Sequence, residues 1–235
     1  MAGRAWQLVL EQVERDLLDG RLGPGDRLPS ERELSADLGV GRSSVREAFR
    51  VLEVMGLIRT ATGSGPTSGA IVIATPTGGL SALMRLQVAA QGFPLTDVVQ
   101  TRLVLEDAVA ASLASDSARD TADAHRILDA MDAGDLTAAE FLALDAQLHL
   151  ALAESSGNTV IAAMMAGLRT SVESYVLTGS EQISDWDAMT SRLRAEHRAI
   201  VAAIDAGDAD AARTRVREHI TGYYTAAGLT PGTED

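Results

Sequence analysis

The sequence predicts a mainly α-helical protein, with a small mixed N-terminal domain followed by an all-helical bundle of about seven helices. Apolar residues recur at helical spacing along most of the 235 residues, of which 46% are hydrophobic and only 3% aromatic. Residues 30–58 hold two short helical patterns joined by a glycine turn, and two short strand patterns follow them. These observations predict two domains, each with its own core.

The net charge of −13 argues against a nucleic-acid partner until its distribution is considered. Residues 1–75 carry nine arginines against ten acidic residues, whereas residues 76–235 carry eleven against twenty-three. Basic groups therefore meet least competition in the N-terminal domain. No apolar run approaches about 18 residues, and residues 1–20 are too charged for a signal peptide, so we expect a soluble cytoplasmic protein without a membrane partner. The absence of cysteine excludes disulfides and thiolate metal ligands.

The N-terminal domain is predicted to begin with a helix that ends near Gly20. The apolar stripe of this helix is Trp6, Val9, Leu10, Val13 and Leu17. A second helix starts after Ser30, which can form a capping box with Glu33, and it ends at Gly39. Leu34 gives it an apolar edge, so both helices can bury one face in a shared core.

The third helix follows at once, with Ser44 and Glu47 as its predicted cap and Gly56 as its stop. Its buried stripe is Val45, Ala48, Phe49 and Leu52. Three arginines spaced by four residues lie on one ridge, displaced from this stripe: Arg42, Arg46 and Arg50. We interpret the pair of helices as a helix-turn-helix whose arginine ridge faces DNA. A solvated basic face on an ordinary helix pair is the alternative.

Two strands are predicted at residues 57–62 and 70–74, separated by the glycine-rich loop GSGPTSG. Three helices followed by a two-stranded hairpin form the winged-helix arrangement. Gly63, near the tip of this wing, would let the backbone approach a phosphate or a minor groove without an obstructing side chain. A plain hairpin turn is the alternative interpretation of the same loop.

The domain boundary is predicted at residues 75–79, where the sequence TPTGG interrupts the apolar pattern. The winged helix-turn-helix domain then spans residues 1–74, the helical domain residues 80–228, and a flexible tail residues 229–235. Seven helices are predicted in the bundle, at residues 80–91, 96–115, 120–133, 137–154, 159–178, 185–205 and 208–227.

Three of the four histidines are predicted to face the interior of the bundle. His149 and Asp145 lie one turn apart on the apolar stripe of their helix, and His197 and His219 lie within the stripes of two later helices. His125 lies opposite the stripe of its helix, so we expect it at the surface. A buried carboxylate beside three buried imidazoles costs free energy unless these groups share hydrogen bonds or a cation.

A divalent metal ion bound by Asp145, His149, His197 and His219 would offset this cost, because helical bundles build metal sites from facing helices. Three imidazoles and one carboxylate suit Zn²⁺, with Ni²⁺, Co²⁺ and Mn²⁺ as alternatives. Histidines that are only hydrogen-bonded within the core remain the other interpretation. Arg102 lies four residues before Glu106, which fits either a surface ion pair or a clamp that holds a carboxylate near the metal.

With these residues in hand, the chain resembles GntR-family transcription regulators of the FadR subfamily, whose effector domain is the all-helical FCD type. The N-terminal segment LPSERELSADLGVGRSSVREAFRVLEVMGLI resembles the family's operator-binding motif almost position by position. One departure is Gly41, where many members have Ser or Thr. Four segments resemble those of the FCD metal site, namely RLVLE, DAQLHLALAESSGN, EHRAIVAAIDAGD and REHITGYY. Shorter stretches are most similar to the branch that regulates lactate utilisation.

The resemblance implies a homodimeric repressor that binds a two-fold symmetric operator in double-stranded DNA. It also implies that a small carboxylate, with L-lactate as candidate, binds the metal and Arg102 and changes operator affinity. The direction of this response does not follow from the residues, and effector release of DNA is the more usual one in the subfamily. The implied DNA contacts are Arg4, Arg32, Arg42, Ser43, Ser44, Arg46 and Gly63.

Two rival functions fit parts of the pattern. A metal-dependent hydrolytic enzyme could use the aspartate and histidines, but all four predicted ligands come from protein and we find no further inward acid or base for proton transfer. A DNA-binding head on a purely structural helical bundle is the other rival. We therefore predict a regulator and not an enzyme.

Overall fold

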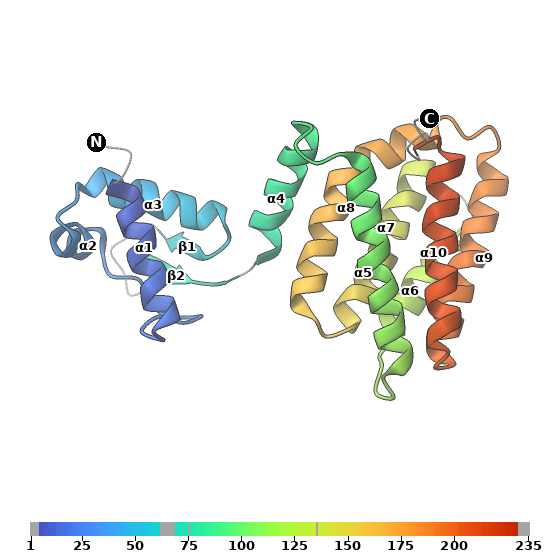
Figure 1. The fold of residues 1–235 in the computed structure, drawn as a ribbon, viewed down its shortest axis with the longest axis horizontal. Coiled ribbons are helices and arrows are strands. Elements are labelled where there is room, and N and C mark those ends of the chain that lie inside the picture. The colour runs from blue at the N-terminus through green and yellow to red at the C-terminus, as the bar shows by residue number, and fades with distance from the viewer. Residues whose placement is uncertain (1–4, 62–68, 75, 135, 230–235) are drawn as a thin grey trace. The chain divides into compact units, whose positions relative to one another are not determined.

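The computed structural model describes residues 5–61, 69–74, 76–134 and 136–229, and the chain divides into two compact units, Met1–Leu80 and Ser81–Asp235 (Figure 1). Helices dominate both units, as the sequence predicts. No helix in the described part of the chain combines the length and the apolar character that crossing a membrane would need.

The N-terminal unit contains three helices and a two-stranded antiparallel sheet within its described residues (Figure 1). These elements are α1 (Ala5–Leu18), α2 (Glu31–Leu38), α3 (Arg42–Val54), β1 (Ile58–Ala61) and β2 (Gly69–Val72). β1 pairs with β2 so that Ile58 lies opposite Val72. Residues of both strands join the helices in one buried core, which consists of Val9, Val13, Leu28, Leu34, Val45, Ala48, Phe49, Leu52, Ile58, Ala70 and Val72. The predicted winged-helix arrangement is confirmed, except for residues 62–68, which lie outside the described residues.

The start of α3 differs from the prediction. The capping box of α2 is present, because the Ser30 side chain accepts from the backbone N–H of Glu33, and Gly39 ends α2 in the left-handed region with φ 63°. α3 instead begins at Arg42 with Gly41 as its N-cap, so the predicted cap by Ser44 is wrong. The N–H of Ser44 already donates to the carbonyl of Gly41, which places Ser44 inside the first turn.

Gly41 leaves the N-terminus of α3 without a side-chain cap, although its φ of −69° and ψ of 147° suit any residue. Gly41→Ser should therefore stabilise the N-terminal unit by a few tenths of a kcal/mol, because a serine oxygen can accept from an unpaired N–H. Gly41→Ala is the matched control, since an added Cβ meets only the Ser43 Oγ at 3.5 Å, an ordinary contact. Urea unfolding should rank Ser above Ala by about 1 kcal/mol. Equal stability of the two variants would show that this cap position is not limiting.

The segment predicted as a linker is mostly helical. α4 spans Pro76–Ala89, so the helix begins four residues before the predicted start at residue 80. Proline is tolerated in the first turn of a helix because the N–H that it lacks has no partner there. Gly79 also lies against α3, where an added Cβ would come within 2.6 Å of the Met55 carbonyl oxygen. The proline and glycines that suggested a linker therefore serve a helix start and a close contact.

The C-terminal unit contains the remaining helices, which lie side by side in Figure 1. They are α5 (Leu95–Ser115), α6 (Ala122–Met131), α7 (Ala138–Ser155), α8 (Thr159–Ser180), α9 (Trp186–Asp205) and α10 (Ala209–Ala226). With α4, they confirm the seven predicted helices to within a few residues at each end. α10 packs against α5 and α9, and α7 packs against α5, α6 and α8. Leu229, predicted to begin a flexible tail, packs instead against the core, while residues 230–235 lie outside the described residues.

Candidate metal centre and nucleic-acid interface

Three helices bring the four predicted metal ligands together inside the C-terminal unit. α7 supplies Asp145 and His149, α9 supplies His197 and α10 supplies His219. The three histidines are buried, with His197 completely inaccessible, and the Asp145 side chain is 15% exposed. The predicted control also holds, because His125 is exposed and contacts Asp205 on the surface. Helical periodicity therefore placed each histidine on the correct face.

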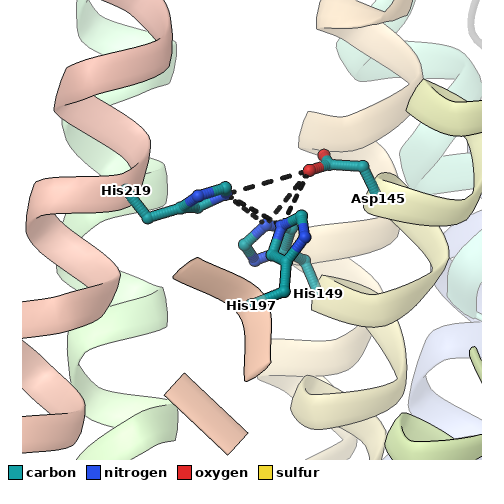
Figure 2. Close-up of side chains that lie close together, drawn as sticks. All are labelled: Asp145, His149, His197 and His219. Atoms are coloured by element: carbon teal, nitrogen blue, oxygen red, sulfur yellow. Dashed lines mark hydrogen bonds and ion pairs between the residues drawn. The ribbon is translucent and has the colours of Figure 1, made fainter. Parts of the chain in front are cut away.

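The polar atoms of these four side chains converge on one point (Figure 2). The Nε2 atom of His219 lies 3.2 Å from Nε2 of His149 and 3.1 Å from Nε2 of His197. Asp145 Oδ1 lies 3.0 Å from Nε2 of His197, 3.8 Å from that of His219 and 4.0 Å from that of His149. One ligand atom from each of the four residues falls within 4.8 Å of all the others.

Two glutamates determine which ring nitrogens carry protons. Glu106 Oε2 lies 2.5 Å from Nδ1 of His149, and Glu196 Oε2 lies 2.9 Å from Nδ1 of His219. A carboxylate only accepts hydrogen bonds, so both Nδ1 atoms donate. In a neutral imidazole the lone pair then lies on Nε2, the atom that faces the cluster. The second-shell arrangement typical of metal-binding histidines is thus present for two of the three rings.

The electrostatics of the cluster indicate a missing positive charge. Burial, together with the neighbouring His197 ring, lowers the pKa of His219 to about 4, so this ring is neutral at pH 7. Burial alone would raise the pKa of Asp145, but the hydrogen bond from His197 and the adjacent imidazoles hold it well below its usual range. The Nε2 lone pairs of His149 and His219 therefore face a carboxylate oxygen in a buried space, which is costly without a cation among them.

A divalent cation fits this set of donors. Four ligands placed tetrahedrally at about 2.0 to 2.1 Å from Zn²⁺ would lie about 3.3 Å apart. Five of the six separations lie between 3.0 and 4.0 Å, and all ligand atoms lie within 4.8 Å of one another. Imidazole nitrogen and carboxylate oxygen also suit Ni²⁺, Co²⁺ and Mn²⁺. When bound, such an ion would supply a positive charge and a Lewis acid to this buried site.

Arg102 and Glu106 form a buried pair beside the cluster, so their interpretation as a surface pair is wrong. Arg102 Nε lies 2.6 Å from Glu106 Oε1, and the two side chains are 11% and 5% exposed. Arg102 also donates through Nη1 to the Tyr224 hydroxyl. Burial opposes the ionised state of Glu106, but Arg102 and His149 outweigh it and lower its pKa to about 2. Glu106 is therefore a further acidic group that faces inward, held between Arg102 and His149, which the sequence did not predict.

A cavity of about 90 Å³ adjoins the cluster and is lined by Arg102, Asp145 and His149. Its other walls include apolar side chains from α7 and α8, among them Leu142, Leu150, Met165 and Val176. A second, smaller cavity of about 20 Å³ shares Arg102 and Asp145 and extends toward Tyr223 and Tyr224. Charged groups from the cluster thus reach a space that a small molecule could occupy.

The predicted DNA contacts in the N-terminal unit divide into three groups. Four of them, Arg32, Arg42, Ser43 and Arg46, are exposed on α2 and α3, while Ser44 is half-buried. Arg46 also pairs with Glu31 at the start of α2, with Nη2 3.0 Å from Oε2. Two further predicted contacts, Arg4 and Gly63, lie outside the described residues. Contact with DNA stays a prediction for all seven residues.

Comparison with known proteins gives a matching family model for each of the two units. The family model of the FCD domain matches residues 97–222, and that of the bacterial regulatory proteins, gntR family, matches residues 7–67. The HTH-type transcriptional regulator LutR of Bacillus subtilis is 32% identical over 211 residues, covering 86% of this chain and 92% of its own. The putative L-lactate dehydrogenase operon regulatory protein of Escherichia coli is 28% identical, covering 92% and 84%. A solved structure of a GntR protein from Streptococcus agalactiae is 25% identical with a TM-score of 0.64, covering 96% and 100%.

Proposed function

Because the chain belongs to the gntR family of bacterial regulatory proteins and carries the FCD domain of its FadR-type members, we propose that it is a cytoplasmic repressor controlled by a small carboxylate. The chain is a DNA-binding transcriptional regulator and not an enzyme, so the metalloenzyme alternative is wrong. The metal ion, the effector, the dimer and the individual contacts belong to the proposal.

The observation that carries the proposal is the shared cavity of Arg102, Asp145 and His149. Arg102 contributes one positive charge to this site, and Glu106 and Asp145 contribute two negative charges. The charges of Arg169 and Glu173, which also line the cavity, cancel each other. A divalent cation would change the resulting net charge from −1 to +1, which favours an anion. A carboxylate could then bind the guanidinium of Arg102 and, as a fifth ligand, the metal, two strong partners for its oxygens.

We propose Zn²⁺ as the ion and a small hydroxycarboxylate, with L-lactate as first candidate, as the effector. The small volume of the cavity and its apolar walls support a compact molecule with one charged end. The similarity to a relative named as a regulator of an L-lactate dehydrogenase operon supports lactate. Arg102 lines the cavity in addition to pairing with Glu106 and Tyr224, which supports an effector site over a purely structural bundle.

We further propose that the protein is a homodimer whose two α3 helices bind successive major grooves of a two-fold symmetric operator. Exposed apolar side chains on the C-terminal unit support a partner surface, with Leu83 and Leu86 on α4, and Val160 and Met164 on α8. Effector binding must then favour a dimer geometry that fits the operator poorly, because a ligand shifts an equilibrium only through its differential affinity.

Operator binding with and without a panel of small carboxylates tests this proposal. An operator is first selected from a random duplex library, and the affinity of the zinc-loaded protein for it is measured by fluorescence anisotropy. We expect L-lactate to weaken operator binding by about five- to 150-fold, the range of typical allosteric coupling. If no carboxylate in the panel changes the affinity, the bundle is not a carboxylate sensor.

Arg42→Ala should weaken operator binding by about 1–3 kcal/mol and relax specificity at one base pair, because an arginine can donate two hydrogen bonds to guanine O6 and N7. Anisotropy titrations on the selected operator and on single-base variants measure both effects. Arg126→Ala is the control, since Arg126 is exposed on α6 and pairs with Asp123. Equal losses on operator and random duplex would show that Arg42 contacts only phosphates.

A further inference from the structure

Two glutamates hold metal-site histidines in the same way. Glu106 accepts from Arg102 Nε through Oε1 at 2.6 Å and from His149 Nδ1 through Oε2 at 2.5 Å. Glu196 accepts from Arg192 Nε through Oε1 at 2.9 Å and from His219 Nδ1 through Oε2 at 2.9 Å. Each arginine precedes its glutamate by four residues, so one helical turn on α5 and another on α9 present the same chain of contacts.

The two series of contacts, one through Glu106 and the other through Glu196, differ in their surroundings. Arg102 and Glu106 are 11% and 5% exposed, whereas Arg192 and Glu196 are 42% and 29% exposed. Arg102 lines the cavity, but Arg192 is not among the residues that line it. Solvent screens the exposed pair, so a substitution at Arg192 has little effect on the electrostatic energy of Glu196. The buried pair lacks that screening, and a change at Arg102 acts strongly on Glu106.

We propose that Glu106 is a positioning residue that couples the cavity arginine Arg102 to the metal-binding histidine His149. This inference rests on the proposed metal and carboxylate site. One oxygen of Glu106 keeps the lone pair of His149 on Nε2, directed at the metal position, while the other holds the Nε edge of Arg102 and leaves the guanidinium at the cavity. A carboxylate that binds Arg102 then changes metal binding by His149 through Glu106, in addition to any direct contact between the carboxylate and the metal.

The chemistry of the two oxygens makes Glu106→Gln a sharp test. Glutamate offers two acceptors, and both partners of Glu106 are donors. Glutamine offers one acceptor and one donor, so it must place an N–H against either Arg102 or His149. If the amide N–H faces His149, it favours the ring form with the proton on Nε2, which cannot bind a metal. Either choice breaks the chain of contacts that links the cavity to the metal site.

The experiment measures Zn²⁺ affinity of the full chain by competition with a chromophoric chelator. We expect Glu106→Gln and Glu196→Gln each to weaken Zn²⁺ binding by about 10- to 100-fold, since each replaces a charged carboxylate that contacts a histidine with a neutral amide that has one acceptor fewer. Glu106→Asp retains the charge but withdraws both oxygens by one methylene, and it should weaken binding in the same direction. Because Arg102 can only donate, whereas His149 can move its proton to Nε2, the amide oxygen introduced by Glu106→Gln should face Arg102. Long-range ¹H–¹⁵N NMR of the zinc-free protein should then find the His149 proton on Nδ1 in the wild type and on Nε2 in Glu106→Gln.

Coupling is measured by double-mutant cycles on the same Zn²⁺ affinity, with no effector present. Arg102→Lys should change Zn²⁺ affinity at least threefold when Glu106 is present and less than twofold in the Glu106→Gln background. Arg192→Lys should change it less than twofold in either background of Glu196. Equal effects of Arg102→Lys with and without Glu106 would overturn the inference while leaving the metal site intact. A wild-type protein that binds no Zn²⁺ would overturn the inference and the proposed function together.

Discussion

Removal of the proposed metal ion by a chelator should lower the melting temperature of the C-terminal unit by about 8–16 °C. A ligand that binds only the folded state at about 1,000 times its Kd stabilises a protein by about 4 kcal/mol. For a chain of 150–250 residues, each kcal/mol shifts the melting temperature by about 2–4 °C. Without the ion, the carboxylate of Asp145 and the Nε2 lone pairs of His149 and His219 remain buried against one another. Calorimetry before and after treatment with EDTA, and again after Zn²⁺ is restored, measures the shift.

Two histidine variants identify the source of this effect. His197→Ala should melt at the lower temperature and no longer respond to EDTA, because His197 is fully buried and its Nε2 faces the cluster. His125→Ala should keep the full response, since His125 lies at the surface beside Asp205. An unchanged melting temperature in EDTA, together with less than stoichiometric metal in protein never exposed to chelator, would rule out the metal centre.

The sequence alone carried enough information to find the four candidate ligands. Asp145 and His149 are one turn apart on an apolar stripe, and His197 and His219 interrupt two other stripes, so periodicity fixed their inward direction. Periodicity cannot set the rotation of one helix against another. The approach of His219 Nε2 to within 3.2 Å of the other two Nε2 atoms therefore required the packing of α7, α9 and α10.

The sequence did not predict that Glu106 faces the core and contacts His149, and the reason is physical. Arg102 and Glu106 show the same i, i+4 spacing as many solvated ion pairs, such as Arg192 and Glu196 on α9. α5 also contacts α7, α8, α9 and α10, so it buries residues around much of its circumference and has no single apolar stripe. The neighbouring Asp107 is buried as well, where it pairs with Arg213 and Arg217 of α10. For a helix that packs against neighbours on several sides, the sequence pattern therefore does not show which charged residues face the core.

The errors at element boundaries have a similar origin, because the same residue types serve opposite purposes. Ser44 and Glu47 match the pattern of a capping box. However, Gly41 has the extended backbone of an N-cap, and α3 begins at Arg42, before Ser44. Pro76 suggested a linker, but it is the first residue of α4, and the N-terminus is the end of a helix that accepts proline. Local patterns therefore predicted which elements exist more reliably than where each of them begins.

Arg102→Ala should abolish the effector response and lower the free energy of unfolding by about 3–5 kcal/mol, because it leaves the carboxylate of Glu106 buried without its arginine. The variant should still bind the operator, since α2 and α3 belong to the other compact unit. Adding Glu106→Gln should recover part of the lost stability, as the uncompensated charge is gone, but it should not restore the response to carboxylates. Urea unfolding and operator anisotropy with L-lactate measure the two effects separately. If Arg102→Ala still released DNA in response to L-lactate with wild-type affinity, the effector would bind elsewhere, and the charge balance at the cluster would serve stability alone.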